Sequence, residues 1–321
     1  MSGRALITGI NGQDGSYLAE LLLSKGYEVA GIVRRSSVAE QQTSRIEDIR
    51  NRLQLFYGDV TDVSSLMRAF TEFKPTEIYN LAAQSHVGIS FQSPLFTTQV
   101  SGMGALNVFD TARQICPEAR IYQASSSEMF GNSIDFDGYQ RETTCMLPVS
   151  PYGCAKVFAH NCAVNYRCAY GMYISCGILF NHESPRRGAN FVTAKVVKTA
   201  VEMTRDPNKK LLIGNVLAAR DWGHAKDYVE VMWRMLQHGS PSDFVVATGK
   251  SHSVQDLIDY VFGALGVSQE RIETDARYLR KEELHLLRGD STKAREKLGW
   301  YPEYGFETML DEMIEHWSNV L

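Results

Sequence analysis

The 321-residue sequence contains no apolar run that approaches the roughly 18 residues needed to span a bilayer as a helix. Its first residues, MSGRALITGINGQDG, lack the basic segment and long apolar stretch of a signal peptide, and predict a strand and a turn. Basic and acidic residues nearly balance, 33 against 37, and no basic run alternates with aromatic side chains. We therefore expect a cytoplasmic protein that binds neither membranes nor nucleic acid.

The cysteines lack the spacing of a zinc site or a disulfide framework. No two of them form a CxxC pair and no histidine cluster accompanies them; they are Cys116, Cys145, Cys154, Cys162, Cys168 and Cys176. We expect free thiols in a reducing compartment and no bound metal. The chain shows no internal repeat, and its 44% hydrophobic and 22% charged residues are typical of a folded globular protein.

Short apolar segments alternate with helical patterns through the first half of the chain. Gly26 suits the left-handed end of the first helix. Strands are predicted at residues 4–8, 28–34, 53–60, 77–83, 120–125 and 174–181. This alternation predicts an α/β fold, with a Rossmann-type, doubly wound parallel sheet covered by helices on both faces.

A smaller unit is predicted after the last of these strands. A polar segment, NHESPRRGAN, is followed by helices at 192–204 and 253–265 and by short strands at 210–214 and 243–248. We predict a Rossmann domain over residues 1–182, to which part of 214–240 returns, and a C-terminal α/β lobe formed mainly by 183–321. A helical apolar pattern predicts core positions at Met232, Trp233, Met235 and Leu236.

A glycine pattern follows the first strand directly. Gly9, Gly12 and Gly15 are spaced three residues apart and open the first helix. Such a turn lets a pyrophosphate approach the backbone, and the start of the helix offers free N–H groups to the phosphates. Three glycines alone could mark a structural turn, but the order of strand, turn, helix and second strand favours a dinucleotide site.

Two arginines and two serines lie about 20 residues further on, where an NAD-binding chain carries an acidic residue. These residues, Arg34, Arg35, Ser36 and Ser37, offer guanidinium and hydroxyl groups to a 2′-phosphate and predict NADP. A solvated basic loop is the alternative. Asp59, after the third strand, is placed to accept from the adenine amino group, although an aspartate at a turn can also be purely local.

A tyrosine and a lysine share one face of a predicted helix. Ser150 suits the N-cap and Pro151 the first turn, which places Tyr152 and Lys156 four residues apart. An ammonium beside a phenol favours the phenolate and lowers the pKa of the tyrosine, so that it can exchange a proton near neutrality. This spacing occurs by chance on many helices, but it carries weight beside a dinucleotide turn.

A run of serines and a glutamate end the fifth predicted strand. Ser125, Ser126, Ser127 and Glu128 lie where open α/β sheets place their active sites, beyond the carboxyl ends of the strands. The serines could form only a turn. Glu128 indicates more than plain hydride transfer, because an alcohol–ketone oxidoreductase needs no carboxylate there.

Together with residues 80–84 (NLAAQ), these motifs resemble the extended short-chain dehydrogenase/reductase family, and more narrowly the GDP-mannose 4,6-dehydratases. The likeness runs from Ala5 to about Trp300. It is carried by GINGQDGSYLAELL, RRSS, NLAAQSHV, QASSSEMFG, SPYGCAK, ILFNHESPRRG and RDWGHAKDYVE. The last two strings are not general features of the wider family.

The resemblance implies an NADP-dependent lyase of nucleotide-sugar metabolism, on the routes to GDP-fucose or GDP-rhamnose, that acts on a GDP sugar as a homotetramer, a dimer of dimers. The implied catalytic residues are Ser126, Glu128, Tyr152 and Lys156. Cofactor contacts are expected at Gly9, Ile10, Asn11, Gly12, Gln13, Asp14, Gly15, Arg34, Arg35, Ser36, Ser37, Asp59, Val60, Leu81, Ala82, Ala83, Gln84, Ser85, Tyr152, Lys156, His182 and Arg187. Substrate contacts are expected at Ser85, Ser126, Ser127, Glu128, Asn181, Lys195, Arg220, Arg280 and Glu283.

The implied reaction converts GDP-mannose to GDP-4-keto-6-deoxymannose. Tyr152 takes the C4 hydroxyl proton as a hydride leaves C4, while Lys156 lowers the phenol pKa and Ser126 holds the C4 oxygen. Glu128, helped by Ser127, removes the C5 proton and protonates the departing C6 hydroxyl, and the hydride then returns to C6 and a proton to C5. Alternatives are the same dehydration of a related sugar such as GDP-manno-heptose, a GDP-4-keto-sugar reductase or epimerase, and a non-catalytic NADP sensor.

The chain departs from the family pattern at a few positions. Phe96 stands where a tyrosine is expected near the cofactor, and Ala194 replaces an arginine. Lys281 and His285 alter a segment of the sugar lobe. Because these changes gather where the nucleotide sugar is expected, the sequence leaves the identity of the sugar open rather than the chemistry.

Overall fold

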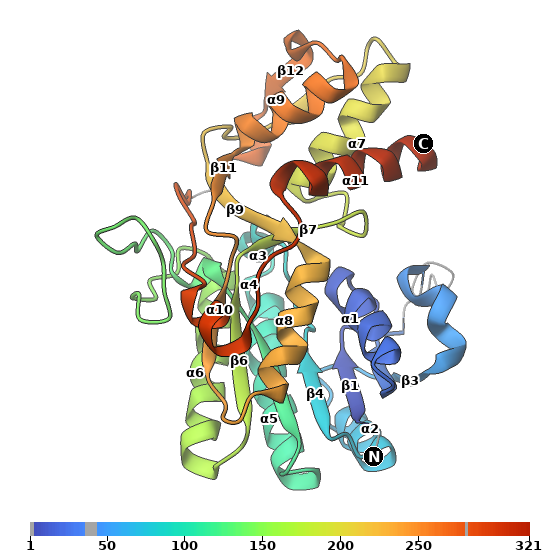
Figure 1. The fold of residues 1–321 in the computed structure, drawn as a ribbon, viewed down its shortest axis with the longest axis vertical. Helices are drawn as coiled ribbons and strands as arrows, with labels where there is room; N and C mark the ends of the chain where they lie inside the picture. The colour runs from blue at the N-terminus through green and yellow to red at the C-terminus, as the bar shows by residue number, and fades with distance from the viewer. Residues whose placement is uncertain (1–2, 36–43, 280–281) are drawn as a thin grey trace.

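The central feature of the computed structural model, which describes residues 3–35, 44–279 and 282–321, is a parallel sheet of seven strands. Their order is β10-β6-β5-β4-β1-β2-β3 (Figure 1). The strands are β1 (Arg4–Thr8), β2 (Glu28–Val33), β3 (Leu53–Tyr57), β4 (Glu77–Asn80), β5 (Arg120–Ser126), β6 (Ile174–Leu179) and β10 (Asp243–Val246). The doubly wound parallel sheet predicted from the sequence is confirmed.

Four strands end earlier than their apolar patterns predict. The strands β2, β3, β4 and β6 end at Val33, Tyr57, Asn80 and Leu179, although each apolar pattern runs further. The residues that follow leave the sheet at its carboxyl edge. An apolar run therefore marks burial beyond the last paired residue, because loops at this edge are covered as well.

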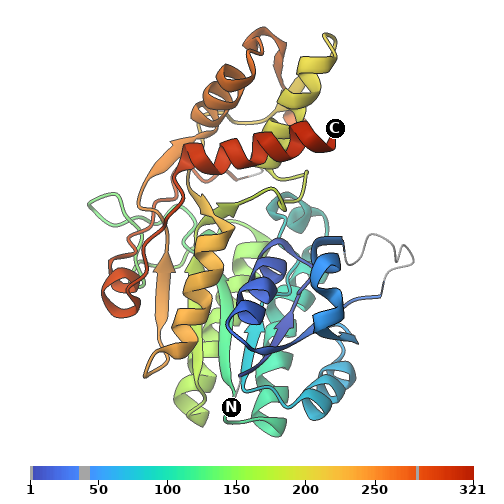
Figure 2. The same cartoon turned by 45° about the vertical axis from the view of Figure 1, so that its right-hand side comes forward.

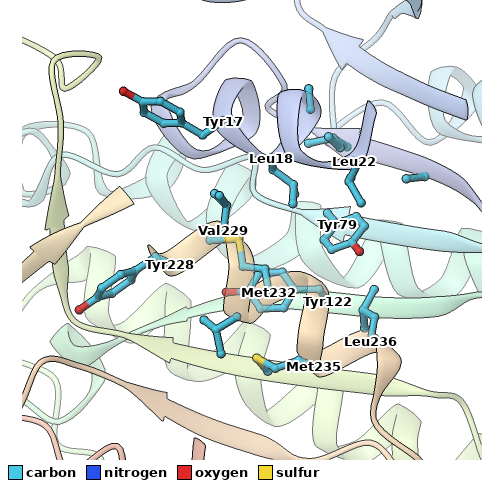
Figure 3. Packing of buried hydrophobic residues seen from close by; sticks show 14 of the residues in the cluster. Tyr17, Leu18, Leu22, Tyr79, Tyr122, Tyr228, Val229, Met232, Met235 and Leu236 are labelled. Carbon is cyan, nitrogen blue, oxygen red and sulfur yellow. The ribbon is translucent and has the colours of Figure 1, made fainter. Parts of the chain in front are cut away.

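One face of the sheet is covered by α1 (Gln13–Ser24) and α8 (Ala225–Gln237). Met232, Met235 and Leu236 of α8 are fully buried against Leu22 of α1 and the ring of Tyr122 on β5 (Figure 3). The core positions predicted on this helix are confirmed, with Trp233 partly buried at the edge of the same cluster. Complete burial of each such side chain contributes about 1.5–3 kcal/mol to stability.

The other face is covered by α2 (Val63–Phe73), α5 (Gly104–Ile115) and α6 (Pro151–Tyr170). Ser150 accepts a hydrogen bond from the Gly153 N–H at 3.0 Å, so the predicted N-cap of α6 is confirmed. Asp62 caps α2 in the same way, through the Ser64 N–H. The two covering layers bury the strands on both sides, as continuous apolar strands require.

The strand β10 corrects a prediction. The sequence pattern predicts that the strand at residues 243–248 belongs to the smaller lobe. In the structure, Asp243–Val246 pairs in parallel with Cys176–Leu179 of β6 and forms an edge of the central sheet. α10 (Thr292–Leu298) packs beside it. The polypeptide therefore returns to the central sheet well beyond residue 240. The sequence did not indicate this, because a short apolar strand has no local feature that identifies the sheet it joins.

The smaller lobe is built on α7 (Val192–Arg205), α9 (Val254–Leu265) and α11 (Phe306–Val320), with β8 (Leu211–Ile213) and β12 (Ile272–Thr274) (Figure 2). These helices share one apolar cluster, in which Leu257, Leu310 and Met313 are fully buried. A three-stranded sheet, β11-β9-β7, lies between the lobe and the main sheet. Its strands are β7 (Asn181–Glu183), β9 (Ala219–His224) and β11 (Ser251–Ser253). No helix in the described part of the chain is long and apolar enough to cross a membrane.

Candidate active site

A cavity of about 1120 Å³ lies at the carboxyl edge of the central sheet, beneath the smaller lobe. Its floor comes from the residues that follow β1, β4 and β5, and its roof from β7, β9 and the segments beside α7. Parallel sheets place their ligand sites at this edge, because the strand ends and helix N-termini meet there.

The glycine turn forms a cradle at one end of the cavity. Gly9 has φ +72°, and the Gly12 N–H donates to its carbonyl at 2.9 Å. A Cβ on Gly15 would lie 2.3 Å from the Gly9 oxygen, so the turn closes onto the helix only because no side chain is present. Gly12 precedes α1 without a side-chain cap, which leaves the first N–H groups of the helix for a ligand. These residues fit the pyrophosphate of a dinucleotide.

The start of α1 is tied to the β7 segment by charged and polar side chains. His182 Nε2 lies 2.8 Å from an Asp14 carboxylate oxygen, and Gln13 donates to the His182 carbonyl at 3.1 Å. Burial opposes both charges, but the attraction between the pair prevails, so the pKa of His182 is raised and that of Asp14 is lowered. The dinucleotide cradle is thereby joined to the roof of the cavity.

The end of β5 carries the carboxylate. Ser126 and Glu128 are each less than 10% exposed, and the Glu128 N–H donates to Ser126 Oγ at 3.3 Å. The buried Tyr152 phenol comes from the first turn of α6 and lies close enough to Ser126 for that side chain to act to lower the tyrosine pKa. The structure thus brings a serine, a tyrosine and a glutamate from two elements to one wall of the cavity.

The pKa of the tyrosine differs from the sequence-based expectation, although Tyr152 and Lys156 both lie on α6 as predicted. Burial raises the pKa of Tyr152 to about 12 against the lowering influence of Ser126 and Arg187, and the charge of Glu128 raises it further. Lys156 Nζ lies 5.7 Å from the centre of the tyrosine ring and donates to the Ala124 carbonyl at 2.8 Å. Burial lowers the pKa of this lysine to about 8. The predicted lowering of the phenol pKa is therefore outweighed here by burial.

A second set of polar side chains lies at the lobe end of the cavity. Arg220 is 5% exposed and donates to the carbonyl of Leu284 at 2.9 Å, with Glu283 at 3.4 Å. Arg187 pairs with the buried Glu183 at 3.0 Å. Because main-chain oxygens and carboxylates fix these guanidinium groups, they are held in place for an anionic ligand.

Most of the residues predicted for the site line this one cavity, including all four proposed catalytic side chains, Ser127, His182, Arg187, Asn181, Lys195, Arg220 and Glu283. Asp59 does so too, although its carboxylate accepts from the N–H and hydroxyl of Thr61, as the local alternative predicted. Ser36, Ser37 and Arg280, with Lys281, lie outside the described residues.

Four of the positions named in the sequence analysis lie outside the cavity lining. Ile10 is fully buried in the core beneath the glycine turn, and Arg35 is exposed outside the cavity lining. Gln84 turns away, since its N–H donates to Ser101 Oγ and its side chain to the His86 carbonyl. Phe96 is 46% exposed and lies outside the lining as well.

Several lining residues escaped the sequence analysis. They include Arg45 near the glycine turn, His86 to Ile89, Phe91 and Gln92 around α3 (Val87–Gln92), Asn190 and Phe191 before α7, and Arg277 to Leu279 in the lobe. Only their position in space marks them, because they come from loops and short helices without regular periodicity. The NLAAQSHV string could have indicated His86, since it continues directly from a predicted cofactor segment.

A cluster of His160 on α6, Cys176 on β6 and Asp243 on β10 lies outside the cavity lining. Their ligand atoms fall within 4.8 Å of one another, but the Arg167 guanidinium is 2.5 Å from Asp243 and 3.8 Å from the Cys176 sulfur. His160 Nδ1 is bonded to Ser125 Oγ at 2.9 Å. A cation is thus already supplied by the chain, which leaves this cluster as an internal ion pair.

Comparison with known proteins gives a consistent result. A model of the family described as GDP-mannose 4,6 dehydratase matches residues 6–313. GDP-mannose 4,6 dehydratase 1 of Arabidopsis thaliana is 48% identical, over 97% of this chain and 88% of the relative. Among solved structures, the dTDP-glucose 4,6-dehydratase of Bacillus anthracis in complex with NAD has a TM-score of 0.86 at 21% identity, covering 99% of this chain and 97% of that one. RMD of Pseudomonas aeruginosa, complexed with NADPH, has a TM-score of 0.81 at 21% identity, covering 99% and 100%.

Proposed function

The chain belongs to the GDP-mannose 4,6-dehydratase family, and from that premise we propose that it is a lyase that dehydrates GDP-mannose to GDP-4-keto-6-deoxymannose with NADP as its cofactor. One observation carries this proposal beyond the family match. A buried carboxylate, Glu128, shares a cavity wall with the Ser126–Tyr152 pair, next to the glycine cradle. Proton removal from carbon and hydroxyl departure both need such a group in addition to the redox pair.

The bound dinucleotide would supply the acceptor that takes a hydride from the sugar C4 and gives it back at C6. Around it, Tyr152 Oη removes the proton of the C4 hydroxyl, and Ser126 Oγ holds the C4 oxygen. Lys156 is placed one helical turn below Tyr152, on the same face of α6, where its ammonium can hold a ribose hydroxyl.

Glu128 then acts on the neighbouring carbons. The C4 ketone makes the C5 proton acidic, so the Glu128 carboxylate can remove it. The carboxylic acid formed in this way returns the proton to the C6 hydroxyl, which leaves as water with help from Ser127. When the hydride returns to C6, C5 takes up a proton, which balances the proton that Tyr152 removed from the C4 hydroxyl. Glu128 and Ser127 are both almost fully buried, and this excludes bulk water from the elimination step.

The nucleotide end of the substrate would be held by the lobe. Arg220 is fixed by Glu283 and can pair with the diphosphate of the substrate. Arg187, fixed by Glu183, influences the pKa of Asp14 at the glycine turn and stays assigned to the cofactor. Lys195 Nζ lies 3.0 Å from the centre of the Tyr278 ring, at the end of the cavity farthest along the lobe. A flat aromatic side chain beside a cation suits a purine base.

NADP is proposed over NAD because of the segment that follows β2. The strand ends at Val33, and Arg34 lines the cavity in the position where a ribose-binding carboxylate would be expected for NAD. Fluorescence titration with NADPH and NADH tests this assignment. Equal affinity for both would refute it.

A homotetramer and a cytoplasmic location remain proposals that rest on the family resemblance. Exposed apolar side chains on α4 (Pro94–Thr98) and α6 support self-association, since Leu95, Phe96 and Phe158 are 80%, 46% and 41% exposed. Light scattering of the purified protein measures the mass directly. A monomer at micromolar concentration would refute the tetramer.

The proposed reaction is tested by mass spectrometry after incubation with GDP-mannose. The expected product is lighter by one water, and NADPH does not accumulate, because the hydride returns to the sugar. If GDP-mannose is unchanged, GDP-manno-heptose is the next substrate, given the departures at Ala194 and His285. Glu128→Gln separates dehydration from the reductase or epimerase alternative: elimination should collapse, whereas a reductase would lose little.

A further inference from the structure

A chain of buried polar side chains links three strands beneath the cavity. Thr8 ends β1, Asn80 ends β4, and Gln123 lies opposite Asn80 on β5; none is more than 3% exposed. Thr8 Oγ1 donates to Asn80 Oδ1 at 2.7 Å, and Asn80 Nδ2 donates to Gln123 Oε1 at 2.7 Å. Amide side chains are placed here between apolar strands only because each finds a partner.

The hydrogen bonds along this row of polar side chains all run in one direction. The N–H groups of Leu81 and Ala82 both donate to Thr8 Oγ1, so the threonine proton must point to Asn80. Asn80 therefore accepts at its oxygen and donates from its nitrogen, which fixes the orientation of Gln123 in the same sense. The final donor, Gln123 Nε2, reaches the Ala124 carbonyl at 3.0 Å.

That carbonyl is also the partner of the lysine. Lys156 Nζ donates to the same Ala124 oxygen at 2.8 Å, so a glutamine amide and an ammonium share one acceptor. β4 pairs with β5 only as far as Gln123, whereas the pairing of β5 with β6 continues to Ser126. No β4 residue lies opposite Ala124, so on that side the Ala124 oxygen accepts from the two side chains instead of from a main-chain N–H.

We propose that Gln123 is a positioning residue for Lys156, and that the chain from Thr8 to Gln123 couples the lysine to the turn at Leu81 and Ala82 that lines the cofactor end of the cavity. This inference rests on the proposed function, because it assigns Lys156 a role at the cofactor. Gln123 touches neither the cavity nor the reacting atoms, and acts through the Ala124 carbonyl.

The charges that face Lys156 are few. Asp14 at the start of α1 raises the lysine pKa, burial lowers it more strongly to about 8, and the Tyr152 ring lies beside it on α6. Every member of the polar chain is neutral. A carboxylate in place of the Gln123 amide would add one negative charge at most about 6 Å from Nζ, since both nitrogens bind the same oxygen.

The test uses the pH dependence of NADPH binding, measured by nucleotide fluorescence on the full-length protein. Wild-type affinity should fall as the pH rises past about 8, because the ammonium is lost. Gln123→Glu should move this midpoint upward by about one to two pH units, since the new carboxylate favours the ammonium. Gln123→Leu should weaken binding roughly tenfold at pH 7, because the acceptor is no longer held.

Two further variants separate positioning from stability. Thr8→Val removes the hydrogen bond from Thr8 to Asn80 at the far end of the polar chain. The double variant Thr8→Val with Gln123→Leu should lose less NADPH binding free energy than the sum of the two single variants. Ser175→Ala is the control, because it removes a fully buried hydroxyl on β6 that accepts from the Ser242 N–H and belongs to neither the polar chain nor the cavity lining. It should lower the melting temperature without moving the pH midpoint.

A Gln123→Glu protein that melts like the wild type and keeps the wild-type midpoint would overturn the inference. Additive losses in the double variant would overturn the coupling to Thr8. NADPH binding needs no turnover, so the proposed function fails separately: a wild-type protein with the expected pH midpoint that leaves every GDP sugar unchanged would refute the dehydratase and leave the role of Gln123 intact.

Discussion

Gly15 and Gly263 offer the same substitution in two helices with opposite expected outcomes. In an exposed helix interior, Gly→Ala stabilises a protein by about 0.5–1 kcal/mol, because alanine has less backbone freedom to lose on folding. Gly263 lies within α9, and a Cβ there meets nothing within 4 Å. At Gly15 in α1 the Cβ would lie 2.3 Å from the Gly9 oxygen and 2.7 Å from Ile10 Cα.

The contacts at Gly15 are all with backbone atoms, so no side chain can rotate away. Overpacking of this kind costs about 1–3 kcal/mol, from which the helix gain of up to about 1 kcal/mol is subtracted. We expect Gly15→Ala to lower the free energy of unfolding by about 1–2 kcal/mol and NADPH affinity at least tenfold, and Gly263→Ala to raise stability and leave affinity unchanged.

Urea denaturation followed by circular dichroism measures both free energies, and fluorescence titration measures the affinity. A Gly15→Ala protein as stable as Gly263→Ala, with wild-type affinity, would show that helix propensity outweighs the contacts. This result would refute the inference that the glycine turn must lack a side chain at residue 15 in order to fold and to bind the dinucleotide.

Three further predictions follow from the same kind of reasoning. Leu236→Ala, in the fully buried core beneath α8, should lower the free energy of unfolding by about 2–5 kcal/mol in urea denaturation; a loss below 1 kcal/mol would contradict its packing. The raised pKa of His182 means that its pairing with Asp14 stabilises the fold fully below pH 6.5 and less as the pH rises through the folded-state value, while the lowered Asp14 pKa keeps the carboxylate charged above pH 3.8. Asp14→Asn should therefore cost about 1–3 kcal/mol near pH 6 and less at pH 9, and a loss independent of pH would argue against the ion pair. Arg220→Met should weaken GDP binding at least tenfold in calorimetry and leave NADPH affinity unchanged, because its partners Glu283 and Leu284 lie at the lobe end; equal loss of both ligands would contradict that division.

The sequence predicts the parallel sheet well because its signals are local. Each strand of the first half is a short apolar run, each helix has its own periodicity, and the Ser150 cap of α6 can be read from adjacent residues. β10 shows where such signals end. Its apolar residues predict a strand. Where Asp243–Val246 pairs depends on the tertiary structure, in which one edge of β6 is not paired with β5 and is available to β10.

The candidate site divides in the same way. The glycine turn, the end of β5 and the start of α6 carry motifs, and the structure brings them to one cavity. The residues that close the cavity from the lobe, such as Phe191 and Tyr278, are separated by more than 80 positions and have no pattern in common. The hydrogen bond from Lys156 to the Ala124 carbonyl could not be predicted either, because every residue has a main-chain oxygen and the sequence does not show which one a side chain contacts.

Burial in this cavity orders the two proton transfers of the proposed reaction. The Glu128 charge raises the Tyr152 pKa, so a phenolate and a carboxylate disfavour each other in the same enclosed space. Once the phenolate has taken the C4 proton, Tyr152 is neutral, and the Glu128 carboxylate that acts on C5 no longer has a phenolate beside it. A dehydratase site with both groups exposed to water would lose this dependence, because solvent would screen the two charges.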